Sequence, residues 1–156
     1  MSMLIKNNIY RAGITGYTHD ALGVCRIDEN NVFVPGAIKG EEEDILIVKV
    51  RNGVSYGKIA GITRPSPERT DPLCPYYKLC GGCSTRHMSY KEELSFKLSR
   101  VNSALKHIGN QTLVCEKIIP AEHTERYRNK AVFNISSGST GAFAGFYKGQ
   151  GFLFIA

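Results

Sequence analysis

The chain has 156 residues, of which 42% are hydrophobic and 22% are charged. This is the balance of a soluble globular protein, and it excludes general disorder. No stretch approaches the roughly 18 apolar residues of a membrane-spanning helix, and residues 1–6 lack the features of a secretory signal. We therefore expect a cytoplasmic protein without a membrane partner, whose five cysteines serve metal or redox chemistry rather than disulfides.

The positive charge is unevenly distributed along the chain. Residues 1–60 hold seven basic and seven acidic side chains, whereas residues 61–156 hold thirteen basic and seven acidic ones and so carry the whole net charge of +6. A basic second half favours a polyanionic partner, with nucleic acid first. The alternative is a solvated basic surface that serves only solubility.

Residues 1–63 are predicted to form a small β-barrel domain. Short runs of β-branched and aromatic residues, each bounded by turn formers, predict five strands, at residues 9–18, 22–27, 32–34, 45–50 and 54–62. Five closing strands are typical of the oligonucleotide-binding (OB) fold, although a peptide-binding SH3-like module has a similar size.

Two further expectations concern the acidic end of this domain. Residues 45–50 lack polar alternation, which predicts a strand covered on both faces. Residues 41–44 are four consecutive acids, and we expect them to form a solvated loop.

Residues 64–88 contain a Pro-rich linker and a cysteine motif. Cys74, Cys80 and Cys83 follow the spacing C-x5-C-x2-C, and soft thiolates select zinc or an iron–sulfur cluster over Mg²⁺ or Ca²⁺. His87 would complete a Cys3His zinc site, whereas a fourth thiolate would make an iron–sulfur site. The remaining thiols, Cys25 and Cys115, are expected to be small apolar core groups.

Residues 89–156 begin with a helix and continue with strands. Ser89 and Glu92 form a predicted capping box for a helix that ends near Ile108, before Gly109. Its apolar stripe is expected to pack on a core, and consists of Leu94, Leu98, Val101, Leu105 and Ile108. The segments that follow are predicted to be strands at 113–119 and 131–135, a turn at 136–141, and a hairpin of 142–147 with 151–156.

A basic and aromatic cluster precedes the strand at 131–135. Arg126, Arg128 and Lys130 flank Tyr127, a combination suited to a phosphate backbone with a stacked base. In the alternative interpretation, the arginines are structural and pair with Glu122 or Glu125.

Taken in order, these motifs resemble those of the bacterial uracil-C5 RNA methyltransferases of the 23S ribosomal RNA type. The resemblance rests on Gly-Val-Cys-Arg in the barrel, on C-P-x4-C-G-G-C-x3-H-x2-Y from Cys74 to Tyr90, and on Tyr-Arg-Asn-Lys at 127–130. It runs from about Ile9 to the last residue. It implies a fold that is mainly β: an OB-like TRAM barrel (1–63), an iron–sulfur segment (64–88), and a helix with the start of an antiparallel β domain (89–156).

The resemblance also implies ligands and partners. Cys74, Cys80 and Cys83 would bind a 4Fe–4S cluster whose fourth cysteine falls just past Ala156, and His87 would hold no metal. Arg126, Arg128 and Lys130 would contact 23S ribosomal RNA, and we add two candidates, Arg86 and Arg100. We expect a monomer that is the N-terminal part of a longer protein.

The family uses S-adenosylmethionine, a cysteine that adds to uracil C6, and a carboxylate that removes the C5 proton. No glycine-rich nucleotide loop follows a strand in this sequence. We therefore expect that these 156 residues alone neither bind the methyl donor nor methylate RNA. Two alternatives stay open: a nucleic-acid-binding module with zinc on Cys74, Cys80, Cys83 and His87, and a protein-interaction barrel without an RNA role.

Overall fold

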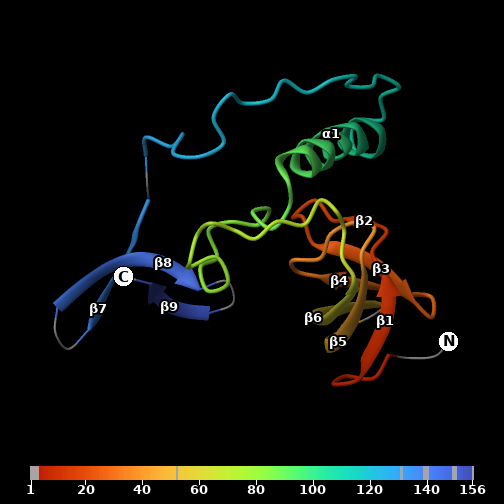
Figure 1. The fold of residues 1–156 in the computed structure, drawn as a ribbon, viewed down its shortest axis with the longest axis horizontal. Helices are drawn as coiled ribbons and strands as arrows, with labels where there is room; N and C mark the ends of the chain where they lie inside the picture. The colour runs from red at the N-terminus through yellow and green to blue at the C-terminus, as the bar shows by residue number, and fades with distance from the viewer. Residues whose placement is uncertain (1–3, 52, 131, 139–140, 149–150, 156) are drawn as a thin grey trace.

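The computed structural model describes residues 4–51, 53–130, 132–138, 141–148 and 151–155. It contains a curled six-stranded sheet, one helix and a three-stranded antiparallel sheet (Figure 1), which confirms the predicted mainly β fold class. Within the described residues, no helix combines the length and apolar character needed to cross a membrane. The first sheet consists of β1 (Ile9–Gly13), β2 (Gly16–Tyr17), β3 (Gly23–Ile27), β4 (Asn30–Val34), β5 (Glu42–Arg51) and β6 (Val54–Arg64).

The first sheet curls into a barrel because one chain segment supplies both of its edges. The strand order is β1-β5-β6-β4-β3-β2, so the predicted strand at 9–18 is two short strands rather than one. Between them, the Ile14 amide donates to Glu41 O and the Thr15 amide donates to Val24 O, each at 2.8 Å. The segment thus passes from β5 on one side to β3 on the other.

The interior of the barrel follows the alternation of strand side chains. Its core consists of Leu4, Ile14, Cys25, Ile27, Val32, Val34, Ala37, Ile45 and Ile47. Cys25 is fully buried, as expected of a small apolar core group. Of residues 45–50, however, only Ile45 and Ile47 are fully buried and Val50 is 40% exposed, so the prediction that both faces of this strand are covered is wrong.

The helix α1 (Tyr90–His107) begins as predicted, at the N-cap Ser89, whose side chain accepts from the Glu92 amide at 3.1 Å. The second hydrogen bond of a capping box, from the Ser89 amide to the Glu92 carboxylate, is replaced by two other contacts. The Ser89 amide donates to Glu68 O at 2.7 Å, and the Glu92 carboxylate accepts instead from the Tyr17 hydroxyl at 2.7 Å.

The predicted apolar stripe does not anchor the helix to the barrel. Val101 is 48% exposed and Ile108 is 86% exposed. Phe96 is the buried residue of α1, and its ring meets Tyr17 edge to face at 5.4 Å. It belongs to a small second core with Ala21, Ile38 and Met88, so the helix rests on the barrel through an aromatic contact that lies off the stripe.

The predicted strand at 113–119 is absent from the structure. The residue Cys115 is held by the side chain of Asn102, whose amide group donates to Cys115 O at 3.1 Å and accepts from Cys115 N at 2.7 Å. One side chain thus replaces a neighbouring strand, while Leu113 and Ile119 stay exposed. Apolar character alone suggested a strand, but none of the strands in the described part of the chain pairs with these residues.

The second sheet contains β7 (Asn134–Gly138), β8 (Gly141–Lys148) and β9 (Gly151–Ile155), in that order. The hairpin predicted from 142–147 and 151–156 is confirmed over the described residues, and Ala156 lies outside them. The strand predicted at 131–135 begins only at Asn134, and the predicted turn at 136–141 is wrong at its start, because Ser136 and Ser137 pair with Phe143 and Ala142.

Candidate nucleic-acid interface and cysteine segment

The cysteine motif lies in a loop whose two ends meet at the barrel. Arg69 and Met88 form an isolated antiparallel bridge, and the Thr70 amide donates to His87 O at 3.0 Å. We call residues 71–86, between these ends, the cysteine loop. Backbone hydrogen bonds thus tie the two ends of the loop together.

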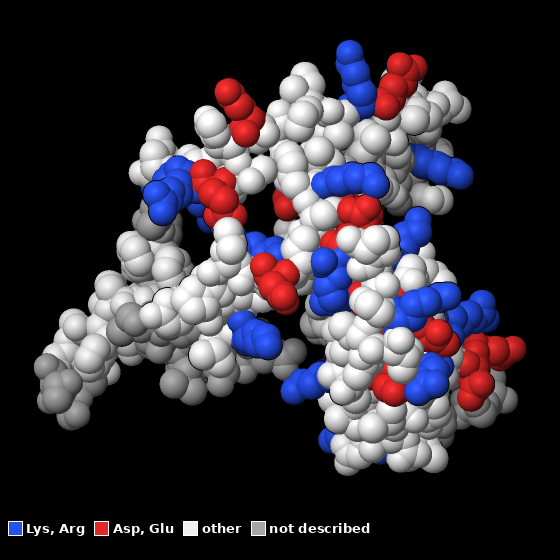
Figure 2. Space-filling view, in the orientation of Figure 1, with Lys and Arg blue, Asp and Glu red and all other residues white. Residues whose placement is uncertain are grey.

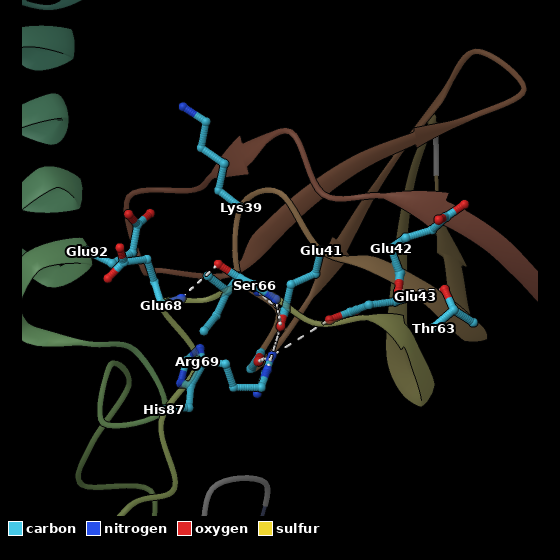
Figure 3. A network of polar contacts seen from close by, with 12 residues as sticks. Lys39, Glu41, Glu42, Glu43, Thr63, Ser66, Glu68, Arg69, His87 and Glu92 are labelled. Carbon is cyan, nitrogen blue, oxygen red and sulfur yellow. Dashed lines mark hydrogen bonds and ion pairs between the residues drawn. The ribbon is translucent and has the colours of Figure 1, made fainter.

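We call the paired ends of this loop, at Arg69 and Met88, its neck. A buried ion pair joins the barrel to this neck (Figure 3). Glu41 is fully buried and accepts from Arg69 Nε at 2.6 Å, from the Ser66 amide at 3.1 Å and from the Ile38 amide at 2.8 Å. Although burial opposes ionisation, these donors hold the pKa of Glu41 below its ordinary value. Arg69 also donates to Gly36 O at 2.8 Å.

The acidic run at 41–44 is therefore not the solvated loop that we expected. Glu43 begins the inward-facing row of β5 and is fully buried as well. Its nearest cation is Arg69, with 3.8 Å between Nη2 and Oε1, and its carboxyl oxygens have no hydrogen-bond partner among the described residues. Burial, together with the neighbouring Glu41, raises the pKa of Glu43 to about 8. The two carboxyl groups thus share one cation, and the raised pKa of Glu43 favours its protonated form.

Sequence reasoning missed this network, although the sequence contains its signal. Glu41 and Glu43 precede Ile45 and Ile47 at a spacing of two, the period of one strand face. No feature of the sequence around Arg69, which lies in the polar linker, indicates that it pairs with these carboxyl groups. Only the fold brings it to the two carboxyl groups.

The three cysteines of the motif lie in the loop with different exposure. Cys74 and Cys80 are half-buried and Cys83 is exposed. The Gly82 amide points at the Cys80 sulfur at 3.4 Å, and Arg86 lies close enough to Cys83 to interact with its thiol. Soft donors, an amide directed at sulfur and a nearby cation all suit a thiolate-bound cluster. In the described residues, however, no three His, Cys, Asp or Glu side chains are gathered closely enough to hold a metal ion.

His87 serves the neck of the loop instead of joining the cysteines. The residue is 3% exposed, and its Nδ1 lies 2.6 Å from the Tyr77 hydroxyl. Burial lowers the pKa of His87, and the neighbouring Arg69 lowers it further, which keeps the imidazole neutral. This placement does not favour the Cys3His zinc alternative.

The candidate RNA contacts fall into two groups. Arg86 makes a two-point ion pair with Glu125, at 2.7 and 3.0 Å, so the predicted structural role of Glu125 is real but its partner is Arg86. Arg126, Arg128 and Lys130 are exposed. The Arg128 guanidinium carbon lies 5.8 Å from the centre of the Tyr127 ring.

Arg100, the remaining candidate, lines a groove between the barrel and α1. The groove has a volume of about 500 Å³, and Lys39 approaches it from the barrel side. Its helix side carries Ser95, Ser99 and Ser103, spaced by one helical turn. Sequence reasoning did not single out this serine row, although its spacing of four was visible.

Figure 2 shows Lys and Arg side chains over the barrel, the helix and the segment beyond it, with Asp and Glu among them. In this view the basic residues do not merge into one continuous patch. On this face the basic side chains are thus spread over several elements that a large polyanion could contact together.

Comparison with known proteins gives one domain match and several similar sequences. Residues 6–60 match the TRAM domain. The chain is 39% identical over 142 residues to an uncharacterized RNA methyltransferase of Clostridium tetani, and 36% identical over 144 residues to one of Halalkalibacterium halodurans, which covers 91% and 92% of this chain. It spans 31% of the length of each relative.

Among solved structures, the chain is similar to a tRNA (uracil-54, C5)-methyltransferase of Pyrococcus abyssi in complex with S-adenosyl-L-homocysteine. The TM-score is 0.43 and the identity is 24%, over 62% of this chain and 21% of that one. Residues 6–60 thus match the TRAM domain, and most of the chain is similar to part of the RNA methyltransferases of Clostridium and Halalkalibacterium.

Proposed function

We propose that this chain is the RNA-binding part of an S-adenosylmethionine-dependent RNA methyltransferase that modifies uracil C5 in 23S ribosomal RNA. The observation that carries the proposal is the similarity to RNA methyltransferases along 91% of the chain, together with the TRAM domain at 6–60. The ribosomal target and the C5 position follow from the resemblance of the motif at Cys74–Tyr90.

The charge and exposure of the second half support an RNA-binding role. Arg126, Arg128 and Lys130 are exposed and follow one another at a spacing of two. Within the described residues none of them belongs to an ion pair, although Arg126 helps to lower the pKa of Glu125. Cations in this state can neutralise phosphates and release counterions. Arg100 and Lys39, which line the groove between the barrel and α1, offer a second place where the phosphate backbone of the RNA can bind. Arg86 contributes less charge because Glu125 already neutralises it.

We further propose that Cys74, Cys80 and Cys83 bind a 4Fe–4S cluster. When bound, the cluster would supply a crosslink for the cysteine loop, whose described residues are mostly exposed and have little apolar core of their own. The bridge between Arg69 and Met88 joins the two ends of the loop through the backbone. The role of the cluster is thus structural in this proposal, and its chemistry is not part of methyl transfer.

RNA binding by the purified chain tests the proposal. A fluorescently labelled 23S ribosomal RNA fragment is titrated at several salt concentrations, with a tRNA as competitor. We expect log K to fall linearly with log salt, with a slope of about −0.7 to −0.9 for each phosphate neutralised, and tRNA to compete poorly.

Matched double variants locate the contact. R128A/K130A should lower both affinity and salt slope, whereas R11A/K91A removes the same charge from residues already paired with Asp44 and Glu68 and should change little. Absence of salt-dependent binding would refute the RNA-binding role and favour a protein-interaction barrel. Equal binding of tRNA would refute only the ribosomal target, which mass spectrometry of RNA methylated by the full-length protein tests independently.

A further inference from the structure

The outer face of the curled sheet places two aromatic rings and a lysine in one row. Phe33 lies opposite Tyr56 in the parallel pair β4–β6, and Tyr56 lies opposite Lys49 in the antiparallel pair β5–β6. The neighbouring residues Val32 and Ser55 are buried. Because side chains alternate between the two faces of a strand, this row points away from the core.

The rows beside it add cations. Lys58 lies on the same face of β6 as Tyr56, two residues further on. The next row in the register contains Arg26, Asn31, Val54 and Arg51. The face thus carries four basic residues, all of them exposed: Arg26, Lys49, Arg51 and Lys58. The ion pairs of the described residues involve none of them. The face therefore has an aromatic centre and a positively charged rim.

The aromatic pair is accessible. The ring centres of Phe33 and Tyr56 are 5.7 Å apart and their planes cross at 76°, so the rings meet edge to face and do not cover each other by stacking. Tyr56 is 37% exposed. Beside it lies a pocket of about 420 Å³, lined by Pro35, Val48, Lys49, Tyr56, Gly57 and Lys58.

We propose that this face is a stacking platform for single-stranded RNA, in which a base lies on Tyr56 while Lys49 and Lys58 contact the flanking phosphates. The proposal rests on the RNA-binding function above and names the surface and the form of RNA that it recognises. A cationic surface alone would bind any polyanion. An exposed aromatic ring among lysines adds a preference for unpaired bases, whose faces are free to stack.

Two RNA strands of equal length and charge separate stacking from charge. The probes are a ten-residue oligouridine and a strand of the same length whose central positions lack bases, titrated against the full chain. We expect the wild type to bind oligouridine more tightly. Tyr56→Leu should weaken oligouridine binding by roughly 5- to 100-fold and leave the abasic strand nearly unaffected.

Two further variants complete the design. Tyr56→Phe keeps the ring and should retain the oligouridine preference. K49A/K58A should weaken both strands and make the salt slope shallower by about 1.4, whereas R11A, whose cation is paired with Asp44, should not. Circular dichroism confirms that each variant is folded.

The possible failures are distinct. If both strands bind equally, no base is stacked and the platform is refuted. If oligouridine is preferred but Tyr56→Leu has no effect, stacking occurs elsewhere, and the inference fails while the RNA-binding function stands. If neither strand binds, and 23S ribosomal RNA does not bind either, the proposed function fails with it.

Discussion

Glu43 makes the stability of the barrel depend on pH. Its pKa is about 8 because the carboxyl group is buried beside Glu41, whereas an unperturbed glutamate has a pKa near 4.5. Between these two values the folded chain keeps a proton that the unfolded chain has released. The contribution of Glu43 to the free energy of unfolding therefore falls as pH rises from about 4.5 to about 8, and it stays low above that.

We predict that Glu43→Gln removes this dependence. Glutamine has nearly the shape of a protonated glutamate and does not ionise, so the variant should gain stability relative to the wild type as pH rises from 5 to 8. Urea denaturation at pH 5, 6.5 and 8 measures the difference. Ser55→Ala changes another buried polar side chain that does not titrate, and its effect should be constant with pH. If the difference in the free energy of unfolding between Glu43→Gln and the wild type were the same at all three pH values, the raised pKa of Glu43 would be contradicted.

Arg69 joins two structural elements that are distant in sequence, the start of β5 and the neck of the cysteine loop. Replacing it with leucine would leave Glu41 ionisable and buried without its cation. Breaking a buried pair in this way costs about 3–5 kcal/mol. We predict a loss of this size for Arg69→Leu in the free energy of unfolding measured by urea denaturation.

The matched control is Arg11→Leu. Arg11 pairs with Asp44 at 2.8 Å, but the two side chains are 60% and 31% exposed, and such surface pairs contribute about 1 kcal/mol or less. Arg69→Lys keeps the charge but loses the two-point geometry, so its effect should fall between the two. Equal losses for Arg69→Leu and Arg11→Leu would show that the buried pair does not hold the neck.

How well each element could be predicted depends on whether its signal is local. The strands of the barrel and the N-cap Ser89 were predictable because turn residues and hydrogen-bonding side chains act over a few positions. The solvated loop at 41–44 was a wrong prediction because the partner of Glu41 lies 28 residues away, in a linker of ordinary polar composition. Helix periodicity likewise showed which residues share a face, but not that Phe96 would meet Tyr17.

At the scale of the whole molecule, the cysteine motif could be predicted from the sequence. Its surroundings could not, because they depend on contacts between residues that are distant in the sequence. Three clustered thiols indicate a metal centre from spacing alone. Only the folded structure shows that Arg69 and Met88 close this loop. Likewise, only the structure shows that His87 is paired with the Tyr77 hydroxyl. Because the barrel core contains none of the three cysteines, the proposed cluster would stabilise the cysteine loop separately from the barrel.

This separation gives a prediction for the cluster. In protein purified without oxygen, the C74S/C80S/C83S variant should lose its iron and its absorbance near about 400 nm, while the β-sheet signal in circular dichroism persists. The reason is that the substitutions remove the soft ligands of the loop but leave the buried core of the barrel intact. Iron analysis, absorbance and circular dichroism on the same samples provide the measurement.

The matched control is Cys115→Ser. Cys115 is a half-buried thiol whose backbone is already held by Asn102, so this variant should keep wild-type iron content. Iron that persists in the triple variant would remove the three cysteines from the ligand set. A colourless wild-type protein with one zinc per chain would instead assign them to a zinc site. Collapse of the sheet signal on loss of iron would show that the barrel depends on the loop, against the separation of the two cores.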